Sequence, residues 1–141
     1  MRLSRYRARA SAVLAAAALL AAGAISAGAV SPLKITNCNS ASSRPKLLTL
    51  TCGDGDTVLK GLRWSSFGGS IARAKGTFVM NTCEPDCAAG RDVSFRANVK
   101  ATSPRACKRG LRVYNKLTLQ FIGQAPADSN DFMRWTLGCP L

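Results

Sequence analysis

The sequence predicts an all-β domain, a small antiparallel β-sandwich or barrel of about six or seven strands reinforced by disulfide bonds. Apolar and polar residues alternate along several short segments, and glycine, proline and aspartate separate these segments. In addition, the chain of 141 residues has six cysteines and no histidine. An even number of cysteines without histidine is typical of an exported domain that disulfides hold together.

The alternation is clearest in residues 93–101 and 111–121. Successive side chains of a strand point to opposite faces, so each segment presents an apolar face to a core and a polar face to solvent. Turn-forming residues, such as those at 53–56 and 68–69, lie between the segments. We expect further strands at residues 46–52, 57–64, 70–80 and 132–137, and a short one at 33–36.

Residues 1–29 have the form of a secretory signal peptide. Four arginines and no acid precede a long apolar stretch, and residues 27–29 read Ala-Gly-Ala, the small-residue pattern of a cleavage site. The alternative is a membrane-anchored protein with an uncleaved leader, because the stretch approaches the roughly 20 residues that span a bilayer. Alanine and glycine dominate the stretch, which favours cleavage and a secreted, extracellular protein without a membrane span.

After cleavage, residues 30–45 are expected to form a flexible lead-in and residues 46–141 a single β domain. The leader contains four of the 20 cations and none of the seven acids, so 16 cations and seven acids remain, a formal charge of +9. Such a charge keeps a protein soluble and attracts it to anionic surfaces.

Cys83 and Cys87 are expected to close a small loop by a disulfide, since only three residues, one of them Pro85, separate them. The alternative, half of a zinc site, needs two further ligands, and an oxidising space favours the disulfide. A redox-active pair usually has two intervening residues instead of three. Six cysteines allow many pairings. The preferred remaining pairs join the chain ends and tie a strand end to the long hairpin loop, namely Cys38 with Cys139 and Cys52 with Cys107.

Residues 62–68 read Leu-Arg-Trp-Ser-Ser-Phe-Gly, and residues 81–90 read Asn-Thr-Cys-Glu-Pro-Asp-Cys-Ala-Ala-Gly. Together with residues 74–77 and 117–119, these segments resemble a family of small secreted actinobacterial proteins of unassigned function. The likeness spans about residues 50–126. In that family a second tryptophan is more common at position 67, and Cys38 and Cys139 look like additions outside the shared core. The resemblance implies an exported β-rich domain and implies no activity.

Phe67 is a candidate surface aromatic residue, which together with Trp64 would form a platform that stacks on a sugar ring or a peptide side chain. The alternative is that both residues belong to the core. Trp64 is expected to end a strand that faces the core, and for Phe67 the sequence leaves both positions open. Trp135 is expected in the core, because Met133 and Leu137 flank it at alternate positions.

The sequence argues against an enzyme. No histidine is present to serve as the base for a serine or threonine nucleophile. A glycosidase needs two carboxylates across one bond, and the candidate acids lie in glycine or proline turns, where aspartate commonly caps its own backbone. Calcium requires about six oxygen ligands, more than these turns supply. We therefore expect no catalytic residue, metal or cofactor at the two candidate pairs, Asp54 with Asp56 and Glu84 with Asp86.

A run of cations between residues 91 and 116 is the strongest functional feature, with Asp92 as its single acid. If residues 93–101 and 111–121 pair as a hairpin, four of these cations share one outward face by the two-residue period of a strand. The alternative is that exposed lysines and arginines only prevent edge pairing and aid solubility. The candidate anion-binding residues are Arg96, Lys100, Arg112 and Lys116 on the face, and Arg105, Lys108 and Arg109 at the hairpin tip.

These features predict a non-catalytic secreted domain that adheres to anionic cell-envelope polymers or lipid head groups. Nucleic acid is disfavoured as a partner, because aromatic residues that would stack on bases are few. An alternative is a protein-binding module, such as an inhibitor or effector, that presents the Cys83–Cys87 loop to a protein partner. A hydrolase without histidine is a third hypothesis.

Overall fold

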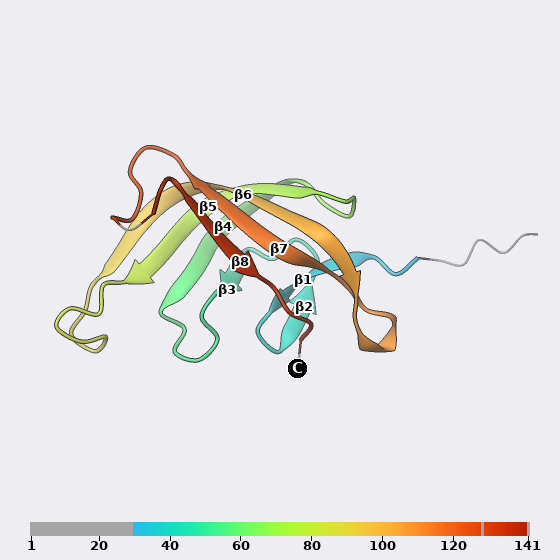
Figure 1. Cartoon of the computed structure of the whole chain (residues 1–141), viewed down its shortest axis with the longest axis horizontal. Helices are drawn as coiled ribbons and strands as arrows, with labels where there is room; N and C mark the ends of the chain where they lie inside the picture. The colour runs from blue at the N-terminus through green and yellow to red at the C-terminus, as the bar shows by residue number, and fades with distance from the viewer. Residues whose placement is uncertain (1–29, 128, 141) are drawn as a thin grey trace, which may run out of the picture.

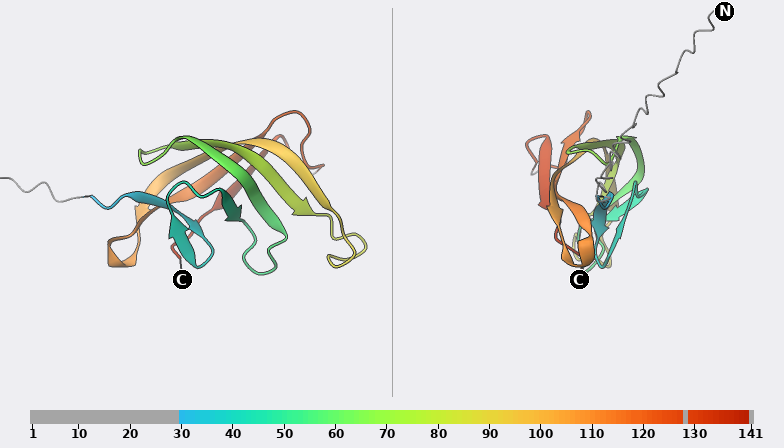
Figure 2. Two further views of the ribbon diagram at one scale, coloured as in Figure 1. Left: turned by 180° about the vertical axis from the view of Figure 1, so that it is seen from behind. Right: turned by 90° about the vertical axis from the view of Figure 1, so that its right-hand side faces the viewer.

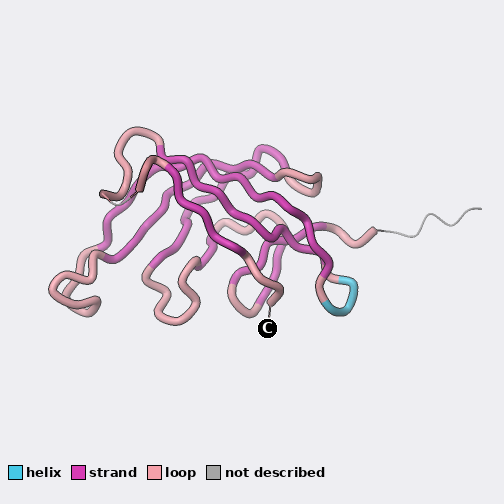
Figure 3. Tube along the Cα trace, in the orientation of Figure 1, coloured by secondary structure: helices cyan, strands magenta, loops and turns pink. Residues whose placement is uncertain are grey.

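The computed structural model describes residues 30–127 and 129–140, and it is all-β, as predicted (Figure 1). The strands form one strongly curled sheet, a half-barrel, with loops at both ends (Figures 2 and 3). The predicted leader lies outside the described residues. Within them, no helix has the length and apolar character that a membrane crossing needs. The strands are β1 (Leu33–Asn37), β2 (Ser40–Ser42), β3 (Leu47–Thr49), β4 (Thr57–Ser66), β5 (Ala72–Asn81), β6 (Asp92–Ala106), β7 (Arg112–Phe121) and β8 (Phe132–Thr136).

Strands β3 to β7 pair in sequence order as an antiparallel meander. The free edge of β7 is shared by two strands. β1 pairs in parallel with its start, where Leu33 lies opposite Arg112, and β8 pairs antiparallel with its second half, where Leu119 lies opposite Met133. β2 then extends the sheet beyond β1. Because β2 and β3 are neighbours in the chain, the curl brings the two edges of the sheet towards each other (Figure 2).

The core lies on the inner side of the curl. Along β6, Ala97, Val99 and Ala101 are buried, whereas Arg96 and Lys100 are exposed, which confirms the predicted alternation. Small inner side chains on β5 and β6 leave room for the sheet to bend around larger ones from the neighbouring strands. The largest fully buried side chains are Tyr114, Phe78, Ile35, Leu48, Leu59, Leu117 and Leu119.

β7 changes its buried face at Asn115. After this residue the odd-numbered side chains of Leu117, Leu119 and Phe121 belong to the main core, whereas before it the side chain of Tyr114 does. Val113 is also buried, but it lies outside that core cluster. The pairing of β6 with β7 is interrupted here, because Ser103, which would face Asn115, has a positive φ of 56°. The alternation predicts Tyr114 on the polar face, and this prediction is wrong because the irregularity turns the start of β7.

The Tyr114 hydroxyl connects β7 to the turn between β4 and β5. It accepts a hydrogen bond from the Gly68 N–H at 2.9 Å and donates one to the Gly69 carbonyl at 2.8 Å. The Tyr114 ring also packs edge-on against Phe67, with 5.5 Å between ring centroids. This buried tyrosine therefore fixes the turn at one end of the half-barrel.

Three disulfides pair all six cysteines. The predicted Cys83–Cys87 bond is confirmed. The other two predicted pairs are wrong, because the structure joins Cys38 to Cys52 and Cys107 to Cys139. Since β8 runs antiparallel to β7, the chain after β8 returns towards the start of β7, and this return brings Cys139 beside Cys107.

The Cys38–Cys52 bond joins the two edges of the curled sheet. Cys38 lies in the turn between β1 and β2, the strand at one edge, and Cys52 follows β3 at the other edge. Beside the disulfide, the side-chain oxygen of Asn37 accepts a hydrogen bond from the Thr49 N–H at 2.9 Å. The Cys38–Cys52 disulfide therefore holds the half-barrel in its curled shape.

The segment 30–45, expected as a flexible lead-in, belongs to the sheet. It contains β1 and β2, and Leu33 and Ile35 of β1 are buried in the core. The short strand expected at 33–36 is thus present, whereas β2 is not predicted by the sequence. Its serine-rich composition resembles a loop, and only pairing with β1 makes it a strand.

Candidate anion-binding surface

Two rows of outward side chains cross the middle of the sheet from β4 to β8. The strand registers place Ser66, Arg73, Lys100, Thr118 and Arg134 in the first row. The same registers place Arg63, Lys75, Asn98, Gln120 and Phe132 in the second row. Neighbouring strands lie about 4.8 Å apart, and the two rows are two residues apart, so long side chains of neighbouring positions reach one another.

Cations dominate the outer side of the sheet around these rows. We call this surface the basic face and define it by the outward lysines and arginines of β4 to β8, all of which are exposed. They are Lys60, Arg63, Arg73, Lys75, Arg96, Lys100, Lys116 and Arg134.

Like charges stand directly opposite each other on the basic face. Arg73 of β5 faces Lys100 of β6, and Arg63 of β4 faces Lys75 of β5. Directly opposed like charges destabilise a sheet. Across the described part of the chain, no acidic residue falls in either row. Asp92 faces the same side of β6 but lies four residues before Arg96, about 13 Å along the strand.

A surface depression of about 340 Å³ lies over the centre of the basic face. Cations, amides and hydroxyls line it together with one aromatic ring, that of Phe132, whose side chain is 48% exposed. Its lining thus combines positive charge with hydrogen-bonding groups and a flat apolar surface, the combination that holds a polar ligand in one orientation. The polar and aromatic lining residues are Ser65, Arg73, Lys75, Asn98, Lys100, Thr118, Gln120 and Phe132.

The structure brings together only part of the cation set that the sequence singles out. Arg96, Lys100 and Lys116 lie on the basic face, but Arg112 does not, because the change of face at Asn115 turns it inward like Tyr114. The tip residues are exposed at the end of the β6–β7 hairpin, where a 3-10 helix spans Lys108–Gly110. Arg105 donates a hydrogen bond from Nη1 to the Asn115 side chain at 3.2 Å.

Sequence reasoning missed the cations that β4, β5 and β8 add to the basic face. Arg73 and Lys75 alternate with Ala72 and Ala74 in the same way that Arg96 and Lys100 alternate with apolar residues in β6. The two-residue period therefore marks them as outward. Only the strand register shows that they stand beside Lys100.

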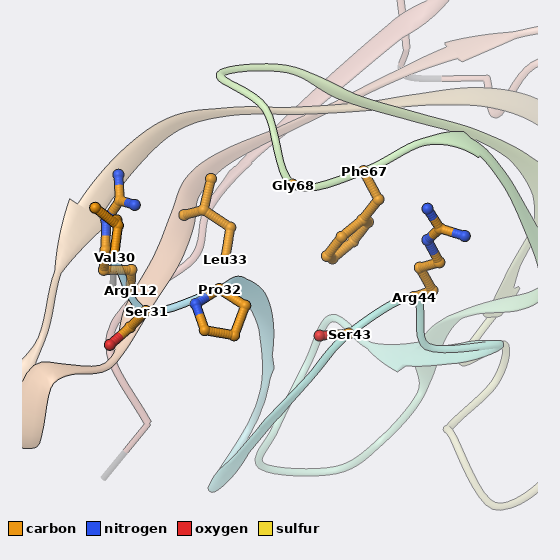
Figure 4. A pocket seen from close by; sticks show the side chains of 9 residues that line it. All are labelled: Val30, Ser31, Pro32, Leu33, Ser43, Arg44, Phe67, Gly68 and Arg112. Atoms are coloured by element: carbon orange, nitrogen blue, oxygen red, sulfur yellow. The ribbon is translucent and has the colours of Figure 1, made fainter. Parts of the chain in front are cut away.

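Arg112 lines a second cavity, of about 420 Å³, at the end of the sheet near β1 (Figure 4). In this cavity, Phe67 lies between Leu33 and Arg44, and Arg112 lies on the side of Val30 (Figure 4). Phe67 is half-buried and packs on the core, so it forms a wall of the cavity and not an exposed platform.

The two tryptophans pack against the core, as expected. The Trp64 ring stands edge-on to Phe67 with 5.0 Å between centroids, and its Nε1–H donates to the Pro45 carbonyl at 2.8 Å. Trp135 lies against Phe78, with 5.9 Å between ring centroids. Both are half-buried at the border of the main cluster.

The Cys83–Cys87 loop is exposed and internally hydrogen-bonded. The Asn81 side chain accepts a bond from the Cys83 N–H at 2.8 Å, and Asp86 accepts one from the Ala89 N–H at 2.9 Å. Gly90 packs so closely on Asn81 and on the Cys83 N–H that a larger residue would collide with them. The loop therefore has a defined shape, which the disulfide and these contacts maintain.

Two of the four turn acids, Asp54 and Asp86, accept hydrogen bonds from the backbone of their own turns. Asp54 accepts a hydrogen bond from the Asp56 N–H at 3.2 Å, and this bond lowers the pKa of the Asp54 carboxyl below its ordinary 3.8. Asp56 also lies near the sulfurs of Cys83 and Cys87, within 4.8 Å. Because these sulfurs form a disulfide, they offer no thiolate to a metal ion.

No family model, curated protein or solved structure matches the chain. Fold and surface alone therefore define its class. It is an all-β half-barrel with three disulfides and a basic outer face.

Proposed function

We propose that this protein is an exported, non-catalytic β domain that adheres to anionic polymers through the basic face. The observation that carries the proposal is the direct opposition of like charges, Arg73 against Lys100 and Arg63 against Lys75, without an acid in their rows. A bound polyanion would relieve this repulsion. The three disulfides agree with an oxidising, extracellular environment.

The sheet presents these cations in a fixed array. A polyanion that lies across the strands meets a new strand about every 4.8 Å. Because hydrogen-bonded strands and a packed core hold the array, binding requires little ordering of the protein backbone. Binding would release the counterions condensed on the polymer, so affinity should fall steeply as salt rises.

The test compares two triple variants with the same change in net charge. The first variant removes cations from the centre of the basic face by the changes Arg73→Gln, Lys75→Gln and Lys100→Gln. The second removes exposed cations before β6 and at the hairpin tip by the changes Arg91→Gln, Lys108→Gln and Arg109→Gln. On immobilised poly-L-glutamate, the first variant should elute at clearly lower salt than the second. The slope of log affinity against log salt should fall by about two to three for the first variant.

Two results of this comparison contradict the proposal. Equal shifts in both variants would mean that net charge alone attracts the polymer and that the basic face has no special part. Unchanged elution of the first variant would mean that the basic face does not bind the polymer at all. Thermal melting of both variants shows whether either change has altered the fold.

The alternative function, a protein-binding module that presents the Cys83–Cys87 loop, is supported by the shape and exposure of this loop. A loop that is ordered before binding loses little entropy on contact with a partner. Under this alternative, one extracellular protein should bind at high salt, and replacement of Glu84 and Pro85 by alanine should abolish that binding. The charge variants of the basic face should then bind the partner normally.

A further inference from the structure

We propose that the depression on the basic face binds an acidic polysaccharide, with Phe132 stacked on a sugar ring and with Arg73 and Lys100 holding the acidic groups. This inference rests on the proposed function and names the class of polymer. It is carried by the exposed ring at the border of the depression and by the amides and hydroxyls between that ring and the cations.

Phe132 is an apolar ring held at a polar surface. On β8, Met133 and Trp135 pack against the core, which fixes the strand, and the alternation turns Phe132 outward opposite Gln120. The neighbouring aromatic rings pack on one another inside the sheet, with Phe78 and Phe121 centroids 5.5 Å apart. The Phe132 side chain instead leaves about half of its surface to solvent. A flat apolar ring in such a position suits the apolar face of a sugar.

Amide side chains separate Phe132 from the cations along the second row. Gln120 and Asn98 follow Phe132 on the next two strands, and Lys75 follows on the third. An amide both donates and accepts hydrogen bonds, which matches the hydroxyl groups of a sugar. Three strand spacings, about 14 Å, separate Phe132 from Lys75. This span exceeds one sugar ring, so the site fits a segment of a chain.

The positive charge of the depression comes from the first row, which lies two residues along the strands from the second row. Arg73 and Lys100 stand opposite each other and line the same depression as Phe132. A carboxylate or phosphate of the polymer placed between them would accept charge-assisted hydrogen bonds from both. A single acidic sugar chain therefore meets the ring, the amides and the cation pair at once.

The same lining disfavours a lipid surface. Thr118, Gln120 and Asn98 present hydrogen-bonding groups around the ring, and acyl chains would leave these groups unpaired. The basic face is also the outside of a curl, so a flat bilayer would touch only part of it (Figure 2). A flexible polymer chain follows such a surface.

The experiment compares polygalacturonate with poly-L-glutamate, because both carry one carboxylate per unit and only the first has sugar rings. Phe132→Ala should weaken binding to polygalacturonate about fivefold and leave binding to poly-L-glutamate unchanged. Phe132→Trp should retain binding to polygalacturonate. Leu47→Ala is the matched control, since Leu47 is also 48% exposed but lies on β3, at the opposite edge of the sheet.

The variant Arg73→Gln with Lys100→Gln separates the inference from the proposed function, and it should weaken binding to both polymers. If it does so while Phe132→Ala changes neither, the sugar inference is overturned and the proposed function stands. If it weakens neither, the proposed function itself fails. If Phe132→Ala weakens binding only to phosphatidylglycerol vesicles, the ring contacts lipid, and the sugar inference is again overturned.

Discussion

Replacing Tyr114 by phenylalanine removes the hydroxyl that joins β7 to the turn between β4 and β5. The ring stays in place, so the substitution leaves almost no cavity. Two hydrogen bonds are lost, one from the Gly68 N–H at 2.9 Å and one to the Gly69 carbonyl at 2.8 Å. Each bond contributes about 1 kcal/mol net.

The free energy of unfolding should therefore fall by about 1 to 2 kcal/mol. The lower value applies if water reaches the freed backbone groups, which is expected because Gly68 and Gly69 are exposed residues of the turn. For a domain of this size the melting temperature should fall by about 4 to 8 °C.

Thermal and urea unfolding, followed by circular dichroism, measure this change. Ser65→Ala is the control, because it removes an exposed hydroxyl that donates to the Arg73 carbonyl at 3.2 Å. This control should change the free energy of unfolding by less than about 0.5 kcal/mol. A Tyr114→Phe variant that melts with the control would refute the role assigned to the buried hydroxyl.

Three further predictions concern the loops and the edges of the sheet. Replacing both Cys38 and Cys52 by serine opens a loop with a sequence separation of 14. The free energy of unfolding in urea should fall by about 3 kcal/mol. An unchanged urea midpoint would contradict the role of this disulfide in holding the curl. Gly90→Ala should lower the melting temperature, because its Cβ would collide with Asn81 and lie 2.8 Å from the Cys83 nitrogen, whereas Gly53→Ala, with no atom within 4 Å of its Cβ, should not. NMR titration should give the Asp54 carboxyl a pKa below 3.8, because it accepts the hydrogen bond from the Asp56 N–H. Any stability that the ionised carboxyl adds is therefore present above the unfolded-state pKa and is lost as pH falls through the folded-state pKa. A pKa at or above 3.8 would contradict the capping role of Asp54.

The strands were predictable because one side of the sheet faces a core. Alternation in β6 separates Ala97 and Val99 from Arg96 and Lys100, and the structure buries the first pair and exposes the second. The local Cys83–Cys87 bond was predictable for a similar reason, since its partners are close in the chain. Features that depend on neighbouring residues are thus visible in the sequence.

Features that depend on strand register were not predictable in this way. The irregularity between Ser103 and Asn115 turns Arg112 away from the basic face, and neither residue type announces a change of face. The Cys107–Cys139 disulfide follows from the path of β8 along β7, and the Cys38–Cys52 disulfide follows from the curl that brings the two edges of the sheet together; no spacing of cysteines encodes either. The basic face itself needs the register, because its opposed cations come from different strands, as Arg73 of β5 and Lys100 of β6 do.

Chemical-shift mapping tests the central claim most directly, since it reports where a polyanion touches the protein. On addition of polygalacturonate, backbone amide resonances should shift most at the centre of the basic face, around Lys75, Asn98, Lys100 and Gln120, and the shifts should reverse at high salt. The proposal would be contradicted if the shifts were largest at the Cys83–Cys87 loop or at the hairpin tip near Lys108. It would also be contradicted if no resonance of the sheet shifted.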